Sequence, residues 1–327
     1  MIEVEHLSKI YGSTTAIEDV HFSVSAGEII GFLGPNGAGK TTTMRILAGY
    51  IPASSGTAKI AGYDVHQQSM EVRKRIGYLP ENPPLYLDLT VESFLHFVAK
   101  IKGISAGERS QKVQNAIARC QLKDKSRTII RKLSKGYRQR VGIAQAIVHE
   151  PPVIILDEPT VGLDPRQIIE VRHLIKSLAG EHTIILSTHI LPEVSMTCDR
   201  VTIINRGKVV TSDTPINLME QLQGNSGYEV EVEGNLDSIL PLLSQITGVS
   251  QVKVIQSEIV KPNRNVLQIV CRANSEPGKE IAATIVNQGL GLYQMRYTRP
   301  SLEDVFLELT TEDLMVASDE ENTTMNN

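Results

Sequence analysis

A glycine-rich stretch near the start of the chain, GFLGPNGAGKTT at residues 31–42, constrains its fold more than any other segment. The stretch fits the pattern G-x-x-x-x-G-K-[ST], follows the apolar run EIIGFLG and opens a helix-like segment. Glycines in such a loop let backbone N–H groups wrap around phosphates. We therefore predict a strand, a phosphate-binding loop and a helix; a glycine-rich connecting turn is the alternative. The candidate phosphate-binding residues are Gly34, Pro35, Asn36, Gly37, Ala38, Gly39, Lys40, Thr41 and Thr42.

Acidic and histidine side chains end two later apolar runs. Asp157 and Glu158 end VIILDEP, and His189 ends IILSTH. One carboxylate suits Mg²⁺, which takes few protein oxygens, and the Thr41 hydroxyl could be a second ligand. The neighbouring Glu158 points the other way and could polarise a water toward a γ-phosphate held by Lys40. His189 could contact that phosphate or be purely structural. Adjacent acids after a strand are weak evidence alone, but together with the glycine-rich loop they predict a phosphate-transfer site.

The order of patterns along the chain predicts an α/β fold. Short strands alternate with turns from residue 1 to about 80, residues 82–145 have helical periodicity, and apolar strands return in PVIILDEP and HTIILSTH. Fully apolar runs of about five residues flanked by helices are typical of buried parallel strands. We predict a nucleotide-binding core with a helical insertion between its strands.

The last third of the chain has a different pattern. A short helix is expected in INLMEQLQ, and the linker GNSG follows it; we place the linker between the domains at residues 221–226. Residues 227–310 then show the order strand, helix, strand, strand, helix, strand, which predicts a small α+β domain of the ferredoxin-like type, βαββαβ. Residues 311–327 are polar and acidic, and we expect them to be disordered.

Composition limits the setting of the protein. The net charge of −4 includes five acidic residues between 312 and 321, so the rest of the chain is close to neutral and no nucleic-acid partner is expected. The three cysteines show no metal-binding spacing, which favours a reducing compartment. The charged start MIEVEHLSKIYG is unlike a signal peptide. No apolar run approaches the roughly 20 residues that span a bilayer. We expect a cytoplasmic protein that reaches a membrane only through a partner.

The stretch LSKGYRQR at residues 133–140 predicts a second helix whose free N–H groups suit an anion. Together with the loop at Gly34–Thr42, the acids Asp157 and Glu158, GLDP at Gly162–Pro165 and His189, it resembles the motif order of ATP-binding-cassette (ABC) ATPases. The resemblance covers residues 1–220. It implies a P-loop NTPase cassette with a RecA-like core, an N-terminal antiparallel β subdomain and a helical subdomain at about 82–145.

The same resemblance assigns roles to further residues. LSKGYRQR is similar to the family's LSGGQ signature, whose helix caps ATP held by the P-loop of a second cassette, so two cassettes would dimerise head to tail. Ser134 and Gly136 would make that contact, and Asp164 would link the two sites. Tyr11 resembles the aromatic residue that stacks on adenine, although a tyrosine there can also be simple packing. The implied small molecules are ATP and Mg²⁺.

Three positions depart from the family pattern. Lys135 replaces a signature glycine, where it could add charge near the γ-phosphate or be solvated, and Tyr137 replaces the signature glutamine. Glu81 occupies the place of the Q-loop glutamine, where a carboxylate can still reach Mg²⁺ or its water while adding negative charge. Arg138 and Arg140 are expected to make structural ion pairs.

Three function hypotheses follow. The first is the ATPase subunit of an exporter with separate transmembrane permease subunits, peripheral on the cytoplasmic face of the membrane. The ending PSLEDVFLELT resembles such cassettes, and IGYLPENPPLYLDLTV looks closest to gliding-motility-associated ones. The second is a non-transport ABC ATPase, disfavoured because the chain has one cassette without long coiled coils. The third treats residues 227–310 as a ligand-sensing module, against the simpler reading of a dimerisation or docking domain. A second copy of the chain is the expected cassette partner.

Overall fold

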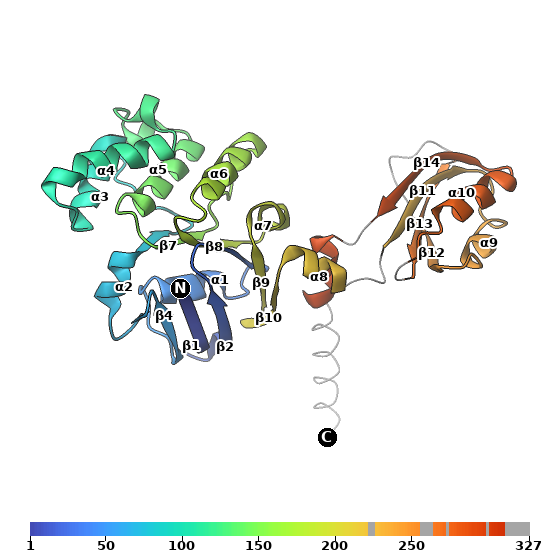
Figure 1. The fold of residues 1–327 in the computed structure, drawn as a ribbon, viewed down its shortest axis with the longest axis horizontal. Coiled ribbons are helices and arrows are strands. Elements are labelled where there is room, and N and C mark those ends of the chain that lie inside the picture. The colour runs from blue at the N-terminus through green and yellow to red at the C-terminus, as the bar shows by residue number, and fades with distance from the viewer. Residues whose placement is uncertain (222–225, 256–263, 273–274, 299–300, 311–327) are drawn as a thin grey trace, which may run out of the picture. The chain divides into compact units, whose positions relative to one another are not determined.

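The structure of the protein, a computed structural model, describes residues 1–221, 226–255, 264–272, 275–298 and 301–310 (Figure 1). The chain divides into two compact units, Met1–Pro215 and Ile216–Asn327. The acidic tail expected at 311–327 and most of the linker expected at 221–226 lie outside the described residues. Within the described residues, no helix has both the length and the apolar character to cross a membrane.

Four antiparallel strands form the first sheet of the N-terminal unit, in the order β2-β1-β4-β5. They are β1 (Ile2–Tyr11), β2 (Thr14–Val24), β4 (Ser55–Ile60) and β5 (Tyr63–Asp64). Along β2, the buried residues Val20, Phe22 and Val24 alternate with exposed ones, as expected for a strand with one face on the core. The sheet is the antiparallel β subdomain that the family resemblance implies.

Six strands form the central sheet, in the order β10-β9-β3-β8-β7-β6. They are β3 (Ile29–Leu33), β6 (Ile76–Leu79), β7 (Val153–Asp157), β8 (Thr183–Thr188), β9 (Arg200–Asn205) and β10 (Lys208–Asp213). All are parallel to their neighbours except β10, which is antiparallel to β9. Every residue of β3, β7 and β8 is buried, which explains why these strands read as continuous apolar runs.

Parallel pairing brings the carboxyl ends of β3, β7 and β8 to one edge of the central sheet. In register, Leu33 pairs with Thr188, and Asp157 pairs with Ser187. The loop that follows β3 therefore lies at the same edge as the acids that end β7, with β8 between the two strands. This is the place where open α/β sheets bind ligands.

Helices surround the central sheet and build the insertion. The helices of the N-terminal unit are α1 (Lys40–Leu47), α2 (Ser69–Arg75), α3 (Val91–Ile101), α4 (Ala106–Arg119), α5 (Lys135–Ile147), α6 (Pro165–Ser177) and α7 (Leu191–Thr197). Helices α3, α4 and α5, drawn in green in Figure 1, pack on one another between β6 and β7 of the sequence. The predicted helical insertion is thus present.

The described residues between 227 and 298 form one antiparallel sheet with two helices in the C-terminal unit. After α8 (Pro215–Gln221) come β11 (Gly227–Glu233), α9 (Leu240–Ser244), β12 (Val249–Ile255), β13 (Arg264–Cys271), α10 (Gly278–Asn287) and β14 (Gly291–Thr298). The strand order is β12-β13-β11-β14, with every neighbouring pair antiparallel. This arrangement is ferredoxin-like, as the element order predicted. Its core includes Val230, Leu267, Ile269 and Ile281.

Candidate nucleotide site

The loop between β3 and α1 needs glycine at two positions. Gly39 has φ +103°, and a Cβ atom there would lie 2.5 Å from Ile17 Cγ2. A Cβ on Gly34 would lie 2.4 Å from the carbonyl oxygen of Ile204. No larger residue fits either place without moving β2 or β9, so the glycine pattern is a requirement of packing as well as of phosphate approach.

Lys40 opens α1 and is held inside the loop. Its ammonium donates to the carbonyl oxygens of Gly34, at 2.8 Å, and Pro35, at 3.1 Å. The side chain is 6% exposed and lies 3.5 Å from the Glu158 carboxylate. The lysine is thereby fixed at the start of a helix, where backbone N–H groups and the helix dipole also favour an anion.

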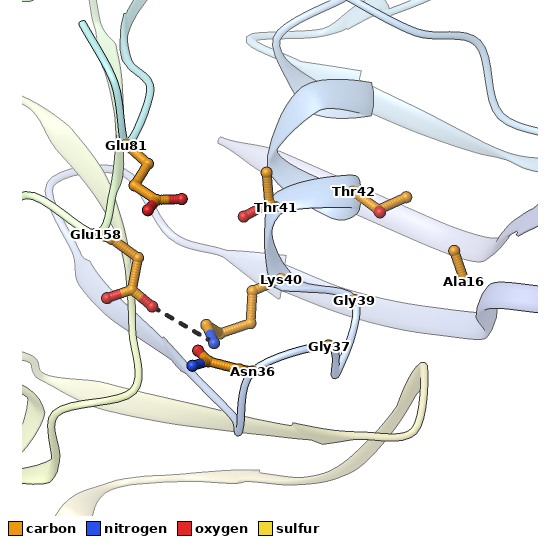
Figure 2. A pocket seen from close by; sticks show the side chains of 9 residues that line it. All are labelled: Ala16, Asn36, Gly37, Gly39, Lys40, Thr41, Thr42, Glu81 and Glu158. Carbon is orange, nitrogen blue, oxygen red and sulfur yellow. Dashed lines mark ion pairs between the residues drawn. The ribbon is translucent and has the colours of Figure 1, made fainter. Parts of the chain in front are cut away.

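A cavity of about 280 Å³ lies over this loop. Its walls come from the loop, from the start of α1, from β2, and from the segments after β6 and β7. Figure 2 shows Glu81 and Glu158 on one side, with Lys40 and Thr41 opposite. The lining residues are Ala16, Asn36, Gly37, Gly39, Lys40, Thr41, Thr42, Glu81 and Glu158.

Asp157 contacts Thr41, one of the residues that line this cavity, through one carboxylate oxygen. Oδ1 accepts hydrogen bonds from the hydroxyls of Ser187, at 2.8 Å, and Thr41, at 3.4 Å. Oδ2 is buried and has no hydrogen-bond partner among the described residues. Burial raises the pKa of the Asp157 carboxyl; the two hydroxyl hydrogen bonds oppose this, and the charges of Glu158 and Glu81 add to it. An unsatisfied carboxylate oxygen beside a hydroxyl and a second carboxylate fits a hard divalent cation.

Glu158 is turned away from its neighbour by its backbone. Its φ of +51° is in the left-handed region, where the strand ends, while its N–H still donates to the Ser187 carbonyl at 2.9 Å. Both carboxylate oxygens lie 2.9 Å from His189 Nδ1. Glu158 therefore lies between Lys40 and His189, and the expectation that it points away from Asp157 is met.

The residues of LSKGYRQR and GLDP come together elsewhere in the same unit. Ser134 caps α5 by accepting from the Tyr137 N–H, and Asp164 caps α6 by accepting from the Gln167 N–H. A Cβ on Gly136 would lie 2.7 Å from the Gln167 side chain, so the two helix starts are in contact. None of Ser134, Gly136 and Asp164 lines the cavity described above.

The three departures from the family pattern also have definite places. Glu81 lines the cavity. The Lys135 ammonium lies against Gly162, at 2.1 Å from the position of a Cβ atom there. The Tyr137 ring lies beneath the charged groups of Lys125 and Arg140. Of the two arginines, Arg140 pairs with Glu170 at 2.5 Å and Arg138 donates to the Leu133 carbonyl.

Tyr11 lies at the end of β1, apart from the cavity lining. Its side chain is about half exposed, and the Lys9 ammonium lies 5.1 Å from the ring centroid. Its stacking on adenine stays a prediction. Two residues that the sequence reasoning did not select belong to the site: Ala16 lines the cavity, and Ser187 holds Asp157. Ser187 stands two residues before His189 in the same motif, whereas Ala16 carries no sequence signal.

Comparison with known proteins agrees with this geometry. The family described as "ABC transporter" matches residues 17–161. The linearmycin resistance ATP-binding protein LnrL of Bacillus subtilis (strain 168) is 30% identical over 95% of this chain and 98% of its own length. The bacitracin transport ATP-binding protein BcrA of Bacillus licheniformis is 34% identical over 94% of this chain and 97% of its own length.

A solved structure described as "Structure of ATP binding subunit of ABC transporter" is 33% identical and superposes with a TM-score of 0.62. The match covers 68% of this chain and 93% of the solved chain. Because relatives of at least 30% identity extend over nearly the whole sequence, and the phosphate loop and acids meet in one cavity, the chain belongs to the ATP-binding subunits of ABC transporters.

Proposed function

We propose that this protein hydrolyses ATP–Mg²⁺ to drive export through separate transmembrane permease subunits at the cytoplasmic face of the membrane. The observation that carries the proposal is the joined set of Lys40, Glu158 and His189 beside the unsatisfied oxygen of Asp157. Relatives named for resistance to linearmycin and for bacitracin transport support movement of a compound out of the cell. A special closeness to gliding-motility cassettes stays a prediction.

In this proposal each residue has one task. Lys40 and the N–H groups of the loop bind the β- and γ-phosphates. Glu158 orients the attacking water and accepts its proton, and His189 holds the Glu158 carboxylate through Nδ1. Thr41 and Asp157 would hold Mg²⁺. Glu81 would bind the ion directly or through a water molecule. Mg²⁺, when bound, neutralises charge on the phosphate oxygens.

The working unit in this proposal is a head-to-tail pair of cassettes. The start of α5, with Ser134 and Gly136, belongs to a different part of the surface from the cavity of its own chain, and Asp164 lies next to it. A second copy would place that helix start over the phosphates.

The test compares Glu158→Gln with the wild type. Loss of the base should lower the hydrolysis rate about 10²–10⁴-fold while ATP binding persists. Light scattering should then find a dimer only with ATP–Mg²⁺, and Ser134→Ala in the same chain should weaken it. Glu181→Gln, an exposed carboxylate that pairs with Arg119, is the matched control and should leave both measurements unchanged.

Two results would contradict the proposal. One is normal turnover by Glu158→Gln. The other is tight ATP binding by Lys40→Ala, since the loop would then not be the phosphate site. If Glu158→Gln binds ATP–Mg²⁺ but stays monomeric, the homodimer is wrong and the partner is a different cassette, which co-purification with the membrane subunits would identify.

A further inference from the structure

A buried carboxylate joins the two segments that carry Glu158 and His189. Glu193 lies in α7 and is 2% exposed. One of its oxygens accepts a hydrogen bond from the Thr160 hydroxyl, and the other accepts one from the Thr188 hydroxyl at 2.9 Å. Thr160 is two residues after Glu158, and Thr188 directly precedes His189.

The Thr188 hydroxyl is the donor in its hydrogen bond to Glu193. It accepts the N–H of Ile190 at 3.0 Å, so its own proton is available for the Glu193 carboxylate. Burial raises the pKa of Glu193, the two threonine hydroxyls lower it, Glu158 raises it and Arg172 lowers it. A carboxylate in such surroundings is costly unless its acceptors are satisfied, and both oxygens are.

The segment after β7 is joined to β8 at its first residue, where the Glu158 N–H donates to the Ser187 carbonyl at 2.9 Å. Its own backbone closes a turn, with the Val161 N–H donating to the Glu158 carbonyl and the Leu163 N–H donating to the Thr160 carbonyl. These bonds lie inside the segment and do not connect it to β8. Beyond the Glu158 backbone, two side-chain contacts add to the connection. The Thr160–Glu193–Thr188 bridge lies on the buried side, and the Glu158–His189 contact lies on the cavity side.

We propose that Glu193 is a positioning residue, which sets the separation between the Glu158 carboxylate and the His189 ring by fixing both segments to α7. The inference rests on the roles given to Glu158 and His189 above. It assigns no contact between Glu193 and nucleotide. In this proposal Glu193 affects the positions of Glu158 and His189 through its hydrogen bonds with Thr160 and Thr188.

The experiment uses Glu193→Leu, which removes both acceptors at similar volume, and Glu193→Gln, which keeps one. A misplacement of reacting groups by about 1 Å can cost 10²-fold in rate. We expect kcat to fall roughly 10- to 100-fold in Glu193→Leu, with an intermediate fall in Glu193→Gln and unchanged ATP affinity. Thr188→Val should resemble Glu193→Leu. Thr202→Val removes another fully buried threonine hydroxyl, bonded to Ser212, and should leave kcat unchanged.

A second readout separates positioning from a loss of stability. ¹⁵N spectra of the His189 ring report which nitrogen carries the proton, and the Glu158 contact holds it on Nδ1. Glu193→Gln and Thr188→Val should lower the population with the proton on Nδ1, while Thr202→Val should not. A double variant, Glu193→Gln with His189→Ala, should turn over no slower than His189→Ala alone.

Three outcomes would overturn the inference. They are a normal kcat in Glu193→Leu, rate losses that add to those of His189→Ala, and a rate loss in Thr202→Val equal to that in Thr188→Val. If Glu193→Leu does not fold, the Thr188→Val and ring-spectrum results decide alone. A wild type without ATPase activity is a different failure, because it would contradict the proposed function before any variant is compared.

Discussion

Asp157 and Glu158 are adjacent in the sequence but have different surroundings. Asp157 still belongs to β7, so its carboxylate stays among the hydroxyls of Ser187 and Thr41. One residue later the backbone becomes left-handed, and the Glu158 carboxylate faces Lys40 and His189 instead. Non-glycine residues rarely adopt this backbone, and they do so at sites where the surrounding structure holds them. A single change of φ thus gives two adjacent carboxylates different surroundings, and the proposed function assigns them different tasks.

Acid should destabilise the protein through His149, a buried histidine outside the nucleotide site. Its Nε2 donates to the Ile76 carbonyl at 3.0 Å, and Nδ1 is buried with no hydrogen-bond partner among the described residues. Burial, together with the nearby Lys102 charge, lowers the pKa of His149 to about 3. Between that value and the ordinary pKa of about 6.5, the unfolded chain binds a proton that the folded chain does not. The free energy of unfolding should therefore fall as the pH drops below 6.5.

Urea unfolding at pH 7.5 and pH 5 measures this effect. His149→Gln should lose part of the difference between the two pH values, since its side chain cannot be protonated. His173→Gln, on the exposed side of α6, is the control and should keep the full difference. An unchanged pH dependence in His149→Gln would mean that other groups cause the loss in acid.

Helices α3, α5 and α6 begin with side-chain caps. Ser134 begins α5, Asp164 begins α6 with Pro165 in its first turn, and Thr90 begins α3 by accepting from the Ser93 N–H at 3.2 Å. The first two lie where the proposed partner would bind. Thr90 makes the same kind of cap at α3, away from the residues that line the cavity. Removing the Thr90 hydroxyl therefore tests the cap without changing the nucleotide site.

Thr90→Ala should lower the free energy of unfolding by about 0.5–2 kcal/mol, the usual range for loss of an N-cap. Chemical denaturation gives this number, and ATP affinity should be unchanged. Ser105→Ala is a matched comparison, because Ser105 begins α4 without a side-chain cap to the backbone, so its cost should be smaller. Equal losses in the two variants would contradict the cap assignment.

Elements with a local signal could be predicted from the sequence. The phosphate loop, β7 and β8 were found because a motif and an apolar run mark each of them. The C-terminal element order was found because strands and helices there alternate in short, regular segments. Ala16 and Glu193 could not be found in this way. Ala16 reaches the cavity from β2, and Glu193 meets a threonine 33 residues away, so only the folded chain shows either contact.

Each unit of the molecule has its own hydrophobic core. The N-terminal unit has a large core cluster that includes Phe32, Met44 and Ile155, and the sheet β12-β13-β11-β14 covers a separate cluster with α9 and α10. The three cysteines are buried thiols without disulfide bonds. Two separate cores predict two separate unfolding events.

Residues 226–298, expressed alone, should fold cooperatively. Circular dichroism melting of this fragment should give one transition, and Leu267→Ala in its core should cost about 2–5 kcal/mol. Asp237→Ala, on its surface, should cost much less. A fragment with no cooperative transition would show that this sheet needs the rest of the chain.

The pairing of β7 with β8 limits how the protein can change in evolution. Asp157 and Ser187 are opposite each other, with Glu158 one residue after Asp157 and His189 two residues after Ser187. One extra residue in either strand would turn every later side chain to the opposite face. Insertions and deletions should therefore be excluded from these strands, even where substitutions are accepted. The turn at Gly103, which is open on its outer side, can absorb a change of length instead. In an alignment of this family, the segments without gaps should therefore mark the active site as clearly as the conserved residues do.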